Sequence, residues 1–271
     1  MVLDIHEKHE ILMQYLRGFD SLAVAFSGGV DSTFLLKTAH SVLGDKVIAL
    51  TARSLFFPER ELREASAFCE QENIRHIIID FKELDVEGIA ENPANRCYLC
   101  KSALFTQFRA VANEYGIELL AEGSHMDDNA DYRPGHLAIE EQGALSPLRY
   151  AKLTKNEIRA LSKEMGLFSW NKQSFACLSS RFPYGERITH EKLSMVDKAE
   201  QLLLDMGLCQ VRVRHHEGLA RIETDEHGFS ILADLNNREL VHAAFKQLGF
   251  SYVALDLLGY RTGSVNEVLP L

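Results

Sequence analysis

The sequence lacks the features of a membrane or secreted protein. Its 271 residues contain no apolar run of the length that a membrane-spanning helix needs, about 18 to 20 residues. The first residues, MVLDIHEKHEILMQ, carry charged side chains where a secretory signal would have an apolar core. No Asn-X-Ser/Thr glycosylation acceptor occurs in the chain. These absences predict a soluble protein of the cytoplasm without a membrane partner.

Cysteine and positive charge are also scarce. Five cysteines, an odd number, make a poor disulfide framework for a cytosolic chain. The 39 aspartates and glutamates outnumber the 29 lysines and arginines, which gives a formal net charge of −10. This balance argues against a broad basic surface for nucleic acid, though not against a local one.

In the first two thirds of the chain, apolar runs alternate with helical patterns. Residues 22–26 form a continuous apolar run, which is typical of a strand buried on both faces, and three further strands are expected at residues 47–51, 74–80 and 117–123. This alternation predicts an α/β fold with a doubly wound parallel sheet. The polar stretch 124–146 predicts a functional loop, and a capping box at Thr154 and Glu157 predicts a helix over 155–165.

The remaining third predicts a second, smaller domain. Its pattern is a helix, a hairpin around Glu217-Gly218, another helix and a last strand: residues 190–206, 211–215 with 219–223, 236–248 and 251–257. We expect the domain boundary near residue 187. The first domain then covers 1–187, and a small α+β domain covers 188–271.

The stretch AFSGGVDSTFLLK, residues 25–37, joins the first expected strand to a helix. Gly28 and Gly29 let the backbone approach a ligand closely, and the free N–H groups at the helix start favour an anion. Ser27 and Ser32 add hydroxyl donors, so a phosphate group is the expected ligand. Asp31 would repel a bare phosphate, which predicts a magnesium ion between its carboxylate and a pyrophosphate. A tight strand–helix turn would explain the glycine pair alone.

Three cysteines lie in segments expected near the carboxyl edge of the sheet. Cys97 and Cys100 form CYLC directly before Lys101, and Cys177 lies in FACLSSRFPYG. Three thiolates fit an iron–sulfur cluster with one open iron, or zinc with one open position. Incidental reduced thiols are the alternative. The other two cysteines, at positions 69 and 209, follow helix and strand patterns and are expected in the core.

Several of these motifs resemble known families. SGGVDS resembles the pyrophosphate loop of the N-type ATP pyrophosphatases, which cleave ATP between the α and β phosphates and adenylate an oxygen of a second substrate. NADYRPGHLA (129–138), NKQSFACLSSRFPYGERIT (171–189) and VRVRHH (211–216) resemble the LarE family over nearly the whole length. That family inserts sulfur during assembly of the nickel-pincer cofactor of lactate racemase.

The resemblance implies a reaction and two possible sulfur sources. Family members adenylate the carboxylates of pyridinium-3,5-biscarboxylic acid mononucleotide and replace an oxygen with sulfur. Some sacrifice the sulfur of one cysteine, as Cys177 could here. Others hold a [4Fe-4S] cluster on three cysteines and pass on an extra sulfide. Because Cys97 and Cys100 accompany Cys177, this chain resembles the cluster type. A homo-oligomer is also implied.

The resemblance and the sheet geometry together assign the nucleotide site. The catalytic residues are expected to be Cys177, Asp31 and Lys101, with Lys101 neutralising charge as pyrophosphate leaves. For Lys101, a solvated helix residue is the alternative. The residues expected to bind ATP with Mg²⁺ are Ala25, Phe26, Ser27, Gly28, Gly29, Asp31, Ser32, Ser54 and Gly123.

The second domain is expected to hold the phosphate of the second substrate. Arg212 and Arg214 are two apart on a strand and therefore share a face, which suits a phosphate. A solvated strand face is the alternative. The full set expected to bind this substrate is Ser180, Arg181, Arg212, Arg214, Glu200 and Glu223.

Three other functions compete with this hypothesis. A tRNA thiolase could combine the same loop with three cysteines, but the chain is acidic and shows no basic, aromatic-rich extension. An ammonia-using synthetase would not need the cysteines. A module that only senses a nucleotide or a cluster would not turn ATP into AMP and pyrophosphate.

Overall fold

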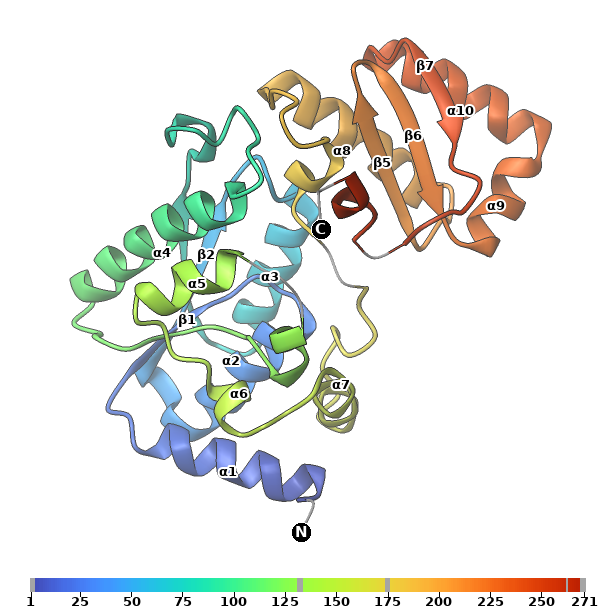
Figure 1. Cartoon of the computed structure of the whole chain (residues 1–271). Coiled ribbons are helices and arrows are strands. Elements are labelled where there is room, and N and C mark those ends of the chain that lie inside the picture. Colours follow the sequence, from blue (N-terminus) through green and yellow to red (C-terminus); the bar gives the residue numbers. More distant parts are fainter. Residues whose placement is uncertain (1–2, 131–133, 174–175, 262, 269–271) are drawn as a thin grey trace. The chain divides into compact units, whose positions relative to one another are not determined.

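The computed structural model describes residues 3–130, 134–173, 176–261 and 263–268 (Figure 1). By their internal contacts, the residues form two compact units, which we describe separately. The first consists of residues 1–82 and 95–175, and the second of residues 83–94 and 176–271. The domain boundary that the sequence predicts near residue 187 stays a prediction. Parts of two sequence motifs, 131–133 and 174–175, lie outside the described residues.

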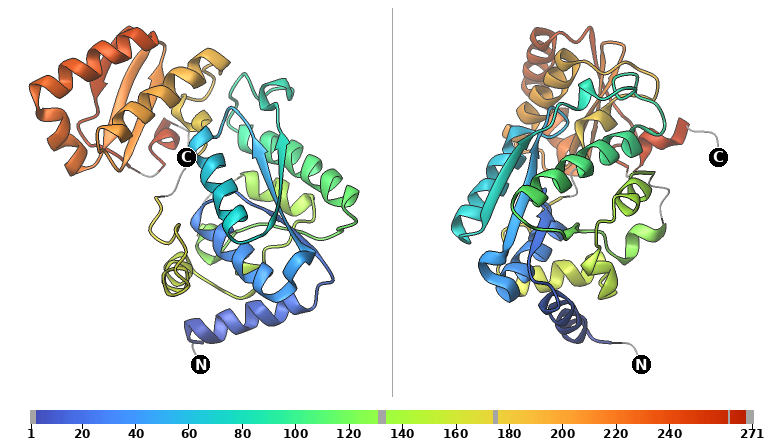
Figure 2. Two further views of the ribbon diagram at one scale, coloured as in Figure 1. Left: turned by 180° about the vertical axis from the view of Figure 1, so that it is seen from behind. Right: turned by 90° about the vertical axis from the view of Figure 1, so that its left-hand side faces the viewer.

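The first unit contains a four-stranded parallel sheet in the order β3-β2-β1-β4. Its strands are β1 (Leu22–Ala25), β2 (Val47–Arg53), β3 (Arg75–Asp80) and β4 (Leu120–Ala121). Helices flank the sheet (Figure 2). The doubly wound parallel sheet predicted from the alternating pattern is therefore confirmed. Because the strand order reverses between β1 and β4, a ligand is expected beyond the carboxyl ends of these two strands.

The helices of the first unit follow the sequence pattern in most places. They are α1 (Ile5–Arg17), α2 (Val30–Leu43), α3 (Glu59–Gln71), α4 (Arg96–Glu114), α5 (Pro134–Glu141), α6 (Pro147–Tyr150) and α7 (Lys155–Glu164). The predicted capping box of α7 is present, with Thr154 and Glu157 bonded to each other's backbone. Side chains of α1 and α2, such as Leu12, Leu16 and Phe34, are fully buried in the core.

Two predictions for this unit were wrong. The stretch 124–146 is not one loop, because α5 lies within it, and a proline opens both α5 and the following α6. Proline is favoured in the first turn of a helix. The apolar pattern of residues 101–115 predicts a helix that begins at Lys101, whereas α4 begins at Arg96, so the CYLC motif is helical. The apolar pattern begins only after Lys101, so it did not predict that residues 96–100 are helical.

The second unit contains a three-stranded sheet in the order β5-β6-β7. The predicted hairpin is confirmed, with Glu217 and Gly218 at positive φ in its turn. The elements are α8 (His190–Asp205), β5 (Val211–His216), β6 (Leu219–Thr224), α9 (Glu226–Ala233), α10 (Leu235–Leu248) and β7 (Tyr252–Leu255). The unexpected helix α9 begins after Asp225, whose carboxylate accepts the Gly228 N–H as an N-cap.

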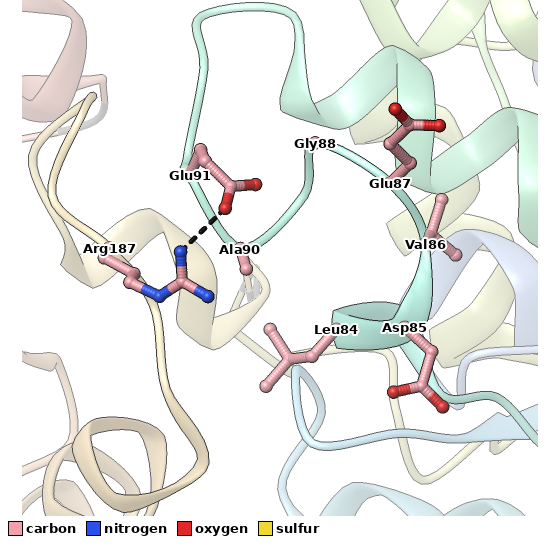
Figure 3. A pocket seen from close by; sticks show the side chains of 8 residues that line it. All are labelled: Leu84, Asp85, Val86, Glu87, Gly88, Ala90, Glu91 and Arg187. Carbon is pink, nitrogen blue, oxygen red and sulfur yellow. Dashed lines mark hydrogen bonds and ion pairs between the residues drawn. The ribbon is translucent and has the colours of Figure 1, made fainter.

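A hollow of about 460 Å³ lies in the second unit, between residues 84–91 and Arg187 (Figure 3). Arg187 reaches Glu91 across it at 2.8 Å. None of the residues predicted to bind ATP or the second substrate lines this hollow. Within the described part of the chain, no helix combines the length and apolar character needed to cross a membrane.

Candidate functional site

The loop between β1 and α2 is shaped by its two glycines. Gly28 has a φ of 70°, in the left-handed region that favours glycine. A Cβ atom on Gly28 would lie 3.3 Å from the Cβ of Ala65 in α3, so glycine also permits a close approach. Gly29 is the N-cap of α2 and has no side chain to cap it. The N–H groups at the start of α2 can therefore bind an anion.

Two serines cross the base of this loop. The Ser27 and Ser32 hydroxyls lie 3.1 Å apart, and the Ser32 hydroxyl also donates to the Gly29 carbonyl at 3.3 Å. Ser32 is buried, whereas Ser27 is exposed and can offer its hydroxyl to a ligand. The preceding Phe26 is buried, and its carbonyl accepts a hydrogen bond from the Thr51 hydroxyl. The loop thus leaves the edge of the sheet at a fixed position.

Asp31 lies at the centre of a charged group that the sequence did not predict. Lys155, the first residue of α7, places its ammonium 2.5 Å from one carboxylate oxygen of Asp31. The other oxygen is buried without a hydrogen-bond partner and lies 3.8 Å from His125 Nε2. Carboxylate oxygens are the preferred ligands of Mg²⁺. The uncommitted oxygen, beside an anion-binding helix start, therefore fits a magnesium ion that accompanies a pyrophosphate.

Gly123 and Ser54, the two predicted ATP-binding residues outside the loop, follow strands of the parallel sheet. Gly123, after β4, lies against the first turn of α2, where an added Cβ would be 3.1 Å from the Ser32 nitrogen. Ser54, after β2, uses its hydroxyl to accept the Phe56 N–H. The structure therefore brings Gly123 to the loop, while the hydroxyl of Ser54 stabilises its own turn.

Cys97 and Cys100 lie on one face of α4, because residues three apart on a helix are neighbours. Both are half-buried. Gly135 of α5 packs beside them, since an added Cβ would be 3.3 Å from Lys101 Cγ and 3.7 Å from Cys97 Cβ. Lys101 also places its ammonium 5.6 Å from the centre of the Phe105 ring. The first turn of α5 thus contacts the start of α4.

Cys177 belongs to the second unit, where it precedes a short 3-10 helix, residues 178–181. Its thiol lies 2.9 Å from the Ser179 hydroxyl. Within the described residues, no three His, Cys, Asp or Glu side chains form a group that could hold a metal ion. Cys97 and Cys100 belong to the first unit and Cys177 to the second, so the shared metal centre stays a prediction.

The two cysteines assigned to the core differ. Cys69 is buried in α3, and this burial raises the pKa of its thiol to about 12. Cys209 is exposed, so its assignment to the core was wrong. It lies before β5, which begins only at Val211.

Arg181 and Glu200 form a buried ion pair in the second unit. Arg181 donates from Nε and Nη2 to the two carboxylate oxygens of Glu200, at 2.8 and 2.9 Å. Burial by itself would raise the pKa of Glu200, but the charge and hydrogen bonds of Arg181 lower it. Arg181 Nη1 also donates to the carbonyls of Ala176 and Cys177. The pair therefore holds the backbone that carries Cys177.

The arginines of β5 lie in the same network. Arg214 donates to the Ser180 carbonyl at 2.8 Å and to Glu223 at 2.7 Å. Arg212 lies 5.1 Å from the centre of the Tyr260 ring. Burial and the neighbouring charge of Arg181 lower the pKa of Arg212. The two arginines are only 7% and 6% exposed, so they do not lie on a solvated strand face.

The structure thus groups the predicted residues in two places. The six residues predicted for the second substrate, joined by Tyr260 and Ser264, form one network in the second unit. The predicted phosphate ligands of the loop lie in the first unit with Lys155 and His125. Sequence patterns do not reveal these four additional residues, because their contacts join distant positions without a local motif.

Comparison with known proteins gives similarities over part and over nearly all of the chain. A family model described as NAD synthase matches residues 5–113. An uncharacterized protein of Synechocystis sp. is 42% identical over 98% of this chain and 99% of its own. A pyridinium-3,5-bisthiocarboxylic acid mononucleotide synthase of Lactiplantibacillus plantarum is 38% identical over 97% of this chain and 95% of its own. A component of the glutamine-hydrolyzing GMP synthase of Methanococcus maripaludis is 27% identical over 53% of this chain and 49% of its own.

Proposed function

The chain belongs to the LarE family of pyridinium-3,5-bisthiocarboxylic acid mononucleotide synthases, and on this premise we propose that it is an ATP-dependent sulfur transferase of nickel-pincer cofactor assembly. Its substrate is pyridinium-3,5-biscarboxylic acid mononucleotide, and its by-products are AMP and pyrophosphate. The observation that carries the proposal is the similarity to the synthase of L. plantarum over nearly the whole of both chains.

The first half of the reaction activates the carboxylate. The start of α2, with the Ser27 hydroxyl, binds the β and γ phosphates of ATP. A magnesium ion held by Asp31 would neutralise charge on the pyrophosphate. A carboxylate oxygen of the substrate attacks the α-phosphorus, and the bond to the β-phosphate oxygen breaks. Lys101 supports the departing pyrophosphate by its positive charge.

The second half exchanges oxygen for sulfur. Cys97, Cys100 and Cys177 would together hold a [4Fe-4S] cluster, which would supply a sulfide for the acyl-adenylate. The positions of Cys97 and Cys100 on one face in the first turns of α4 support this, because the positive end of a helix favours anionic sulfur ligands. Sulfide attacks the carbonyl carbon, and AMP leaves with the former carboxylate oxygen.

A sacrificial route is the alternative for the same step. The Cys177 thiolate attacks the acyl-adenylate and releases AMP. The bond between Cβ and sulfur of Cys177 then breaks as a proton leaves Cα, which gives the thiocarboxylate and dehydroalanine. The half-buried thiol of Cys177, next to the Ser179 hydroxyl, is compatible with either route.

The network of the second unit recognises the substrate. Arg212 and Arg214 supply positive charge for its 5′-phosphate, with Ser180 and Arg181 beside them. Glu200 and Glu223 hold Arg181 and Arg214 in place, and in this proposal they would contact the ribose or the pyridinium ring. The three cysteines are free thiols, which the reducing cytoplasm would keep reduced. We expect the protein to work there as a homo-oligomer.

The test begins with anaerobic purification, followed by a visible spectrum and assays of iron and acid-labile sulfide. A broad band near 400 nm and about four irons per chain are expected. The Cys97→Ala variant should lose the iron, whereas Cys209→Ala should keep it because that thiol is exposed and lies outside the proposed trio.

Turnover with ATP and the biscarboxylate mononucleotide should then give AMP, pyrophosphate and the thiocarboxylate. An iron-free wild-type protein that makes the product while Cys177 loses its sulfur, as judged by mass spectrometry, would establish the sacrificial route. An absence of AMP with this substrate would overturn the proposed function.

A further inference from the structure

Lys172 joins the phosphate-binding loop to the stretch of chain that leads to the second unit. Its ammonium lies 3.3 Å from the Gly28 carbonyl oxygen. The same nitrogen lies 2.7 Å from Glu61 and 2.6 Å from Glu64, two carboxylates of α3. The Lys172 side chain is only 17% exposed. A surface lysine in a simple ion pair would not need to reach a backbone carbonyl of this loop.

The backbone around Lys172 is held independently. Arg159 of α7 donates to the carbonyls of Trp170 and Lys172, at 2.9 and 2.8 Å. The Lys172 ammonium also lies 5.9 Å from the centre of the Phe168 ring. The side chain therefore extends toward Gly28 from a fixed base.

The contact with Gly28 has a direct consequence for the next peptide group. In a trans peptide, the carbonyl and the following N–H point in opposite directions. A lysine that holds the Gly28 carbonyl on one side therefore fixes the Gly29 N–H on the other. That N–H makes only a long contact of 3.4 Å, to the Ser27 hydroxyl. It is available for an anion at the start of α2.

Charge gives Lys172 a second effect. Glu61 and Glu64 lie beside the loop, and two unpaired carboxylates there would repel the phosphates of ATP. Lys172 contacts both of them and offsets this repulsion. Its charge and its hydrogen bond to Gly28 thus favour the same bound anion.

We propose that Lys172 is a positioning residue for ATP: it orients the Gly28–Gly29 peptide so that the loop receives the pyrophosphate part of the nucleotide. This inference rests on the proposed function, which supplies the nucleotide. Lys172 also stands five positions before Cys177 in the chain.

The experiment measures binding of ATP and of AMP to the full-length protein by calorimetry with Mg²⁺. Lys172→Met should weaken ATP binding about tenfold, the loss expected for a charge-assisted hydrogen bond. AMP has no pyrophosphate part, so its affinity should change less than about twofold. Lys172→Arg, which keeps the charge and the donors, should recover part of the ATP affinity. Lys163→Met is the matched control, because Lys163 is exposed and contacts Trp170.

A further variant separates orientation from charge. This triple variant combines Lys172→Met with Glu61→Gln and Glu64→Gln, so it lacks the lysine and also the two carboxylates that would repel ATP. If Lys172 positions the peptide, ATP binding stays weak in this variant, whereas full recovery would overturn the proposal. Equal weakening of ATP and AMP in Lys172→Met would also overturn it. Wild-type protein that binds no ATP would instead refute the proposed function.

Discussion

Arg181 illustrates what a buried charge does at the scale of one residue. Its guanidinium is fully buried and holds Glu200 together with the backbone of Ala176 and Cys177. The motif SSRFPYG placed it near the site, but only the fold shows that its direct partner is a carboxylate on α8. The residue therefore stabilises the segment that carries Cys177 as well as the substrate network.

Replacing Arg181 by alanine should lower the free energy of unfolding by about 3 to 5 kcal/mol, because Glu200 would remain as a buried charge without its partner. The measurement is urea denaturation followed by circular dichroism. Arg187→Ala is the control, since its ion pair with Glu91 is exposed and should contribute less than about 1 kcal/mol. Equal losses in the two variants would contradict this account of Arg181.

At the scale of elements, the sequence predicted the regular parts well. The four parallel strands, the capping box of α7 and the hairpin around Gly218 all follow from local patterns of burial and turn chemistry. The sequence did not predict the helices α5 and α9 or the early start of α4. Tertiary packing stabilises these residues as helices, although their apolar periodicity is too weak to indicate one. In the same way, no local sequence pattern predicts that Lys155 contacts Asp31, which lies 124 positions away.

The packing of α5 on α4 leads to a prediction about metal binding. Gly135→Leu would force side-chain atoms into the space next to Cys97 and Lys101 and displace the start of α4. If Cys97 and Cys100 hold a cluster, iron affinity should fall about tenfold or more, as it does when supports of metal ligands are changed. Iron content after anaerobic reconstitution is the measurement. Leu137→Ala, an exposed position on the same helix, serves as control. Unchanged iron in a folded variant would argue against a cluster at this face.

At the scale of the whole molecule, both units contain histidines that resist protonation. Burial lowers the pKa of His9 and His76 in the first unit, and of His215 and His216 in the second, from the ordinary value of 6.5. The unfolded chain therefore binds more protons than the folded one once the pH falls below about 6.5. Stability should be complete above that pH and decline as the pH falls toward the folded-state values.

The urea midpoint should therefore be lower at about pH 5.5 than at about pH 7.5. The carboxylates with lowered pKa values, such as Glu200, titrate below this window and should not obscure the effect. His76→Gln should reduce the dependence on pH, because glutamine can keep the contact with the Thr51 hydroxyl without titrating. Identical midpoints for the wild type at the two pH values would show that the buried histidines do not control stability in this range.

The short segment 83–94 also matters for how genes of this family can recombine. Asn92 donates to the carbonyls of Phe182 and Pro183, and the Ala90 carbonyl accepts the Ile188 N–H, so this segment is built into the second unit. A single crossover between two parental genes, anywhere from codon 95 to codon 175, would join this segment from one parent to the body of the unit from the other. Selection should therefore favour recombinant genes in which residues 83–94 and residues 176–271 come from the same parent.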